Sequence, residues 1–136
     1  MERLTTDDKL LRGVVGGNGV FSLFVGTGLV TYSDFFRIVF DVERQWVFPV
    51  VGACLIIFAG VVLLLVSRDT IDRKSVQGII LFDTLWVAGS ALLIIFFASF
   101  LTMEGVWFTA IAAVIVADFA ALEYMGLRRV FGRGKK

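Results

Sequence analysis

The sequence predicts an all-α membrane protein in which four transmembrane helices form an antiparallel bundle. Four long apolar stretches carry this prediction, at residues 13–30, 47–66, 79–101 and 106–127. Each stretch is close to the ~20 residues that a helix needs to cross a hydrocarbon core. The composition agrees, because 58% of the 136 residues are hydrophobic and the mean hydropathy is +0.89. Soluble domains are about 45–50% apolar, so we expect one membrane domain over residues 1–136.

The positive charges indicate an orientation for these spans. The N-terminus, the loop between the second and third spans, and the C-terminus hold 11 of the 13 basic residues: Arg3, Lys9 and Arg12; Arg68, Arg73 and Lys74; and Arg128, Arg129, Arg133, Lys135 and Lys136. Because loops rich in lysine and arginine stay in the cytoplasm, we expect both termini to be cytoplasmic. A net charge of +1, with basic residues at membrane edges, argues against a nucleic-acid partner.

The sequence lacks the residues that several kinds of chemistry require. The sequence contains no histidine and one cysteine, Cys54. The usual ligands for haem or zinc and the usual general base are therefore missing, as is any cysteine pair for thiol chemistry. We expect no enzyme activity, no cofactor and no metal site.

Local signals place the helix ends and one additional helix. Thr5 and Asp8 have the spacing of a capping box, which starts the first helix near residue 6. Pro49 suits the first turn of the second span, and Asp72 or Ser75 can cap the third. In the outer loop, residues 31–46, Ser33 can cap a short amphipathic helix over 34–40, which we expect to lie in the membrane interface. The alternative is a lid that packs on the bundle.

Small residues mark the faces on which helices can approach closely. Asn18, Ser22 and Gly26 are four residues apart and share one face of the first span. A second stripe runs along the fourth span: Ala110, Ala113, Ala117 and Ala121. Because small residues allow close helix packing in a bilayer, we expect these faces to support homo- or hetero-oligomers within the lipid bilayer.

Three acidic residues and one asparagine lie inside the predicted spans: Asp83, Asp118, Glu123 and Asn18. An ionisable residue there costs roughly 2.5–3.5 kcal/mol. Counted from the nearest cytoplasmic basic residue, Asn18, Asp83 and Asp118 lie about 9, 13 and 15 Å deep. These three are predicted to meet in one layer. Glu123 lies only about 7 Å deep and is predicted to reach the headgroup region.

Two interpretations of this layer remain open. In the first, Asp83 and Asp118 form a site for a proton or a cation, open to the cytoplasm, because two close carboxylates cannot both ionise easily. Trp86, one turn from Asp83, would add a π face for a cation. In the second, the polar groups are structural and form hydrogen bonds between helices.

A weak direct repeat relates the first and third spans. Residues 12–21 resemble residues 77–86, so that Asn18 corresponds to Asp83 and Phe21 to Trp86 at an offset of 65 positions. The second and fourth spans match poorly. The repeat is therefore predicted only for the first and third spans.

Two short motifs resemble a known class of proteins. D-T-L-W-V-A-G-S at Asp83–Ser90 and G-N-G-V-F-S at Gly17–Ser22 are similar to motifs of small bacterial membrane proteins with four spans, a class without an assigned function. The resemblance implies a multi-pass protein of the inner (plasma) membrane and no chemistry. Small multidrug exporters are similar in size but carry a carboxylate where this chain has Asn18.

Two functions follow as expectations. The first is a non-enzymatic accessory, assembly or interaction subunit that acts through helix packing. The alternative is a small transporter or proton-linked permease that uses Asp83 and Asp118. The sequence points to no particular small-molecule ligand.

Overall fold

The computed structural model describes residues 6–132, and every regular element in that range is helical. The elements are α1 (Thr6–Thr31), α2 (Ser33–Phe40), α3 (Val47–Ser67), α4 (Arg73–Phe97), the 3₁₀ turn η1 (Ala98–Phe100) and α5 (Met103–Gly132). Four of these helices are long and apolar enough to cross a membrane. The predicted all-α bundle with four long apolar helices is confirmed. Predictions that involve Arg3, Thr5, Arg133, Lys135 and Lys136 lie outside the described residues.

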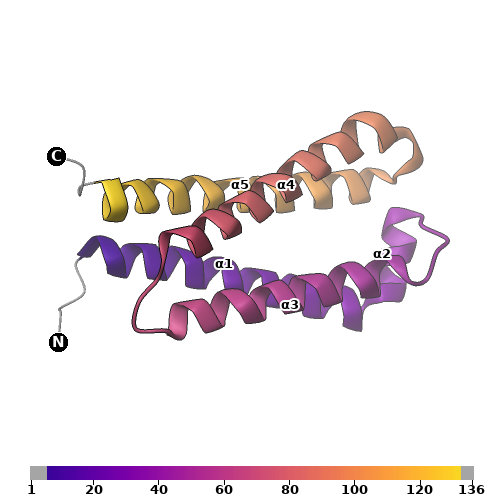
Figure 1. The fold of residues 1–136 in the computed structure, drawn as a ribbon. Coiled ribbons are helices and arrows are strands. Elements are labelled where there is room, and N and C mark those ends of the chain that lie inside the picture. Colours follow the sequence, from indigo (N-terminus) through magenta and orange to yellow (C-terminus); the bar gives the residue numbers. More distant parts are fainter. Residues whose placement is uncertain (1–5, 133–136) are drawn as a thin grey trace.

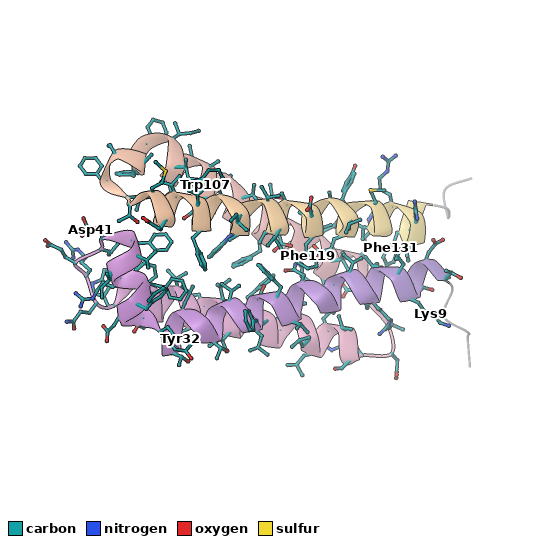
Figure 2. The ribbon with its side chains drawn as sticks, turned by 180° about the vertical axis from the view of Figure 1, so that it is seen from behind. Lys9, Tyr32, Asp41, Trp107, Phe119 and Phe131 are labelled. Atoms are coloured by element: carbon teal, nitrogen blue, oxygen red, sulfur yellow. The ribbon has the colours of Figure 1, made fainter. Side chains whose placement is uncertain are left out.

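The four long helices form two hairpins that meet along one interface. α1 packs most extensively on α3, α4 packs on α5, and α1 also contacts α5. Figure 1 shows α4 diverging from α3 as it approaches the turn into α5. We call the end where α1 begins and α5 finishes the terminal end, and the end with α2 and η1 the loop end (Figures 1 and 2). The α1–α5 contact is therefore the main backbone approach between the hairpins, and α3 and α4 meet through side chains such as Phe58 and Phe82.

Glycine permits the close contact between α1 and α3. A Cβ atom added to Gly52 would lie 2.6 Å from the carbonyl oxygen of Gly26, and one added to Gly26 would lie 2.8 Å from that of Gly52. Both distances are below any normal Cβ contact, so the two backbones touch directly. The face predicted from Asn18, Ser22 and Gly26 is thus used inside the chain. All three of its residues are buried.

Arg12 fixes the terminal end of the α1–α3 hairpin. Its guanidinium donates hydrogen bonds to the carbonyl oxygens of Val66 at 2.8 Å, Arg68 at 2.7 Å and Asp69 at 2.6 Å. These carbonyls lie at or just beyond the C-terminus of α3, where backbone acceptors lack helical partners and positive charge is favourable. Arg12 therefore caps α3 from α1.

At the loop end, α2 packs onto the bundle through aromatic side chains. Phe36 and Phe40 both contact Phe48 of α3 and Phe108 of α5, with ring centroids 5.2–6.3 Å apart. The hydroxyl of Thr102 donates to the carbonyl of Val39, which joins α2 to the α4–α5 connection. The predicted short helix is confirmed. The prediction that Ser33 caps it is wrong, because the N-cap position is Tyr32 and no side chain caps this end.

Asp72 caps the N-terminus of α4, and it is one of the two residues predicted for this role from the sequence. Its carboxylate accepts hydrogen bonds from the hydroxyl of Ser75 at 2.5 Å and from the backbone N–H of Ser75 at 3.2 Å. The bond from the Ser75 hydroxyl is the main reason that the pKa of Asp72 lies below its ordinary value. Asp72 is therefore the start signal of α4, and Ser75 is its partner.

Candidate functional site

Three polar side chains from three helices meet in the interior and form what we call the polar centre: Asn18 of α1, Asp83 of α4 and Glu123 of α5. The side-chain amide nitrogen of Asn18 donates to Asp83 Oδ2 at 2.6 Å and to Glu123 Oε1 at 2.9 Å. Asn18 and Glu123 are 0% exposed and Asp83 is 2% exposed. One amide therefore bridges two carboxyl groups that belong to the other hairpin.

Helical periodicity on each element explains why these side chains point inward. Asn18 lies three residues after Val15 on the buried face of α1, and Asp83 lies four residues after Ile79 on the buried face of α4. Residues three or four apart share a helix face, so each polar residue continues an apolar stripe. Ser22 extends the α1 face, and its hydroxyl lies 3.4 Å from the Asn18 side-chain oxygen.

On α5 the inward face is set by glycine and not by alanine. Gly126 is buried beside Leu11 of α1, and a Cβ atom added to it would lie 3.0 Å from the Leu11 side chain. Glu123, three residues before Gly126, shares that face and is buried with it. Phe119, four residues before Glu123, contacts Phe21 of α1 at 5.9 Å between ring centroids (Figure 2).

The predictions for the two acidic residues Asp118 and Glu123 of α5 are therefore both wrong. Asp118 was expected to join Asn18 and Asp83, but it is exposed on the outside of the bundle. Glu123 was expected to reach the headgroups, but it occupies the polar centre. The two residues are five positions apart, which is about 140° around a helix axis, so one neighbouring helix cannot contact both. Ala110, Ala113 and Ala117 of the alanine stripe are half-buried and Ala121 is exposed, but the stripe does not mark the face of α5 that meets α1, which Gly126 does.

The polar centre contains acids and an amide but no counter-charge. The spans lack lysine and arginine, since none occurs in residues 13–36, 45–67 or 75–127. Among the described residues, Glu123 Oε2 is buried without a hydrogen-bond partner. Two carboxylates close together in a medium of low dielectric repel each other strongly. The arrangement is thus suited to holding a proton or accepting a cation.

The surroundings of the polar centre differ on its two sides. Toward the terminal end, the buried side chains of Leu11, Val15 and Leu127 form part of the main apolar core and cover it. Toward the loop end, Ser22 and Asp83 line a cavity of about 20 Å³. The expectation of a site open at the end that carries the termini is therefore wrong. Trp86, half-buried, lines this cavity on the side away from the termini.

The first and third spans also meet at the positions that the repeat relates. Asn18 and Asp83, which correspond at an offset of 65, are joined directly by the 2.6 Å hydrogen bond. The helices that follow them differ in surroundings, because the backbone of α5 approaches α1 closely, whereas α3 meets α4 mainly through side chains such as Phe58 and Phe82, whose rings stack at 4.2 Å. This difference agrees with the poor match between the second and fourth spans.

Comparison with known proteins assigns no family and no function to the chain. No protein-family model, no curated protein and no solved structure matches the chain. The polar centre and the surface around Asp118 are therefore the two features of the molecule that indicate a function.

Proposed function

We propose that this chain is a non-enzymatic accessory or assembly subunit of a membrane complex, and that α5 docks on a helix of a different protein. The exposure of Asp118 within an apolar helix carries this proposal. Asp118 lies ten residues before Arg128, about 15 Å along the helix axis. An ionisable residue that faces lipid at this depth costs roughly 2.5–3.5 kcal/mol, and contact with another protein removes that cost.

The surface around Asp118 has the form of a helix-packing stripe. Four large apolar side chains share its side of α5 at helical spacing and are exposed: Ile111, Val114, Leu122 and Met125. Residues at these intervals form the seam on which a second helix packs. Asp118 lies in the middle of the stripe, where a partner side chain can reach it.

The charge of Asp118 indicates the chemistry of the partner. A second copy of this chain offers no lysine or arginine within its spans, so a homodimer would place apolar groups or another acid against Asp118. A transmembrane helix that carries a basic side chain at the same depth would neutralise the carboxylate. We therefore assign the stripe to a different protein with an intramembrane lysine or arginine. The resemblance to small bacterial four-span proteins supports a place for the complex in the bacterial inner membrane, and the distribution of basic residues supports a cytoplasmic position for both termini of this chain.

Replacing Asp118 with leucine is expected to abolish assembly while leaving the fold intact. Leucine suits a lipid-facing position, so the isolated variant should be at least as stable as the wild type. The complex should be lost because the partner's basic side chain would be left unpaired. The measurement is native mass spectrometry of the tagged protein, extracted from its host membrane in mild detergent.

Two further variants show whether charge is responsible for the assembly. Asp118→Glu keeps the carboxylate and should retain the partner, whereas Val114→Leu changes the same stripe without changing charge and should also retain it. A wild-type chain that appears alone, or only as multiples of its own mass, contradicts the proposal. Retention of the partner by Asp118→Leu contradicts it as well.

The polar centre supports a second candidate function, a small proton-linked permease. Asp83 and Glu123 are buried without a basic partner, and Glu123 Oε2 has no hydrogen-bond partner among the described residues. Such a pair can take up and release a proton inside the membrane. Glu123 replaces Asp118 as the second carboxyl group of this candidate.

Asp83→Asn and Glu123→Gln separate proton chemistry from structural hydrogen bonding. Either amide keeps an oxygen that accepts from Asn18, so both variants are expected to fold. If the centre moves protons, both should lose acidification of the lumen in proteoliposomes that contain a pH-sensitive dye and experience an imposed pH gradient. Asp118→Asn is the matched control and should retain wild-type flux. Wild-type flux no higher than that of empty liposomes would eliminate the permease and leave the polar centre with a structural role.

A further inference from the structure

The small cavity beside the polar centre is large enough for one water molecule or one ammonium group. Its volume is about 20 Å³, slightly more than the 10–15 Å³ that a single water requires. Ser22 and Asp83 supply its polar lining, and Trp86 contributes to an aromatic lining together with Phe21, Phe58 and Phe82. A carboxylate that has no basic partner within residues 6–132 and an indole face are the groups that recognise a small cation.

A long apolar groove continues from this cavity toward the loop end. The groove has a volume of about 440 Å³, and Val25, Trp86 and Ala112 line both spaces. Leu29 and Phe48 form part of its wall from the α1–α3 hairpin. The wall on the other side comes from α4 and α5, with Leu85, Gly89 and Phe108. Residues of both α3 and α4 line the groove, and Leu85 in its lining is exposed.

The small cavity and the apolar groove together suit one type of ligand. The small cavity accepts a compact positive group at Asp83, and the groove accepts an apolar chain or ring system. A fatty acid would place a second negative charge against Asp83, and a neutral alcohol would leave the carboxylate without a counter-charge. We propose that this region binds lipophilic amines, with the ammonium group beside Asp83 and Trp86 and the apolar portion along the groove. Binding requires neither the partner of α5 nor proton transport.

Fluorescence of Trp86 provides a direct test in the full-length protein. Trp46 and Trp107 are exposed, so Trp46→Phe and Trp107→Phe leave Trp86 as the only tryptophan. The protein is placed in lipid nanodiscs and titrated with 6,7-dibromododecylamine, because bromine quenches tryptophan on contact and the middle of the bound chain would lie in the part of the groove that Trp86 lines. The matched probe, 6,7-dibromododecanol, has the same chain and no charge. Saturable quenching by the amine is expected at concentrations where the alcohol produces only the linear quenching of lipid partitioning.

Two variants test the two parts of the site separately. Asp83→Asn keeps an oxygen that accepts from Asn18 but removes the charge, and it should weaken amine binding about tenfold or more. Gly89→Leu should abolish saturable quenching by filling the groove. A Cβ atom added to Gly89 meets nothing within 4 Å, so this variant is expected to fold normally. Circular dichroism and size-exclusion chromatography check the fold of each variant.

The quenching titrations can support or overturn the proposed amine site. Saturable amine quenching that both variants reduce supports the site. Equal quenching by amine and alcohol in the wild type overturns it, as does saturable binding that folded Gly89→Leu leaves unchanged. If Asp83→Asn does not fold, the Gly89→Leu titration and the comparison of amine with alcohol still decide the question. Failure here leaves the proposed role of Asp118 unaffected, because the two experiments share neither residue nor readout.

Discussion

Replacing Asn18 with leucine is expected to cause the largest loss of stability of any single substitution in the polar centre. Leucine has a similar forked shape but donates no hydrogen bond. The variant leaves the carboxyl groups of Asp83 and Glu123 buried without the amide that bridges them. Leaving buried acceptors unpaired costs about 2–4 kcal/mol here. Equilibrium unfolding in mixed micelles, followed by circular dichroism, measures the difference from the wild type.

A triple variant distinguishes a lost hydrogen bond from poor packing. Asn18→Leu, Asp83→Leu and Glu123→Met together remove every polar group of the centre. Replacing all members of a buried polar network with apolar groups of similar shape is often neutral, so the triple variant should recover to within about 1 kcal/mol of the wild type. If Asn18→Leu alone has wild-type stability, the bridge does not hold the hairpins together. If the triple variant is as unstable as the single one, the cause is steric.

Gly52→Ala is expected to produce the second large effect, because it forces α1 and α3 apart. The added Cβ atom would lie 2.6 Å from the carbonyl oxygen of Gly26, and backbone cannot move aside as a flexible side chain can. Overpacking of this kind costs about 1–3 kcal/mol. The same unfolding measurement detects it, with an independent check from reduced yield of folded protein.

Gly60→Ala is the matched control on the same helix. A Cβ atom added to Gly60 meets nothing within 4 Å, and alanine has a higher helix propensity than glycine. This variant should therefore equal or slightly exceed the wild type in stability. Equal behaviour of the two alanine variants would show that the close contact at Gly52 contributes nothing.

The elements of the fold were predictable because hydropathy and helix-capping signals are local. The four apolar stretches, the short helix before residue 41 and the cap at Asp72 all follow from residues near each other in sequence. The first and fourth spans extend as helices beyond both ends of their apolar stretches, whereas α4 starts earlier than its stretch, at Arg73, but ends at Phe97, four residues before residue 101. A hydropathy pattern locates the membrane core, whereas the helix continues past it into polar surroundings.

The polar centre was predictable only in part because rotation about a helix axis depends on the neighbouring helix. Asn18 and Asp83 lie on faces with clear apolar periodicity, and the structure brings them together. On α5 the apolar residues surround the whole helix, so periodicity did not distinguish Asp118 from Glu123. The distinction came from tertiary contact, in which Leu11 of α1 packs against Gly126 and turns Glu123 inward.

One amide bridges two carboxyl groups across the hairpin interface, and solid-state NMR in lipid bilayers tests this bridge most directly. Asn18 is the only asparagine in the chain, so labelling asparagine with ¹⁵N marks a single side-chain nitrogen. With ¹³C-labelled aspartate and glutamate carboxyl groups, dipolar recoupling reports which of them lie beside it. We predict strong coupling to one aspartate and one glutamate carboxyl carbon, abolished respectively in Asp83→Leu and Glu123→Met. Coupling to neither carbon, or coupling that persists in both variants, would contradict the account.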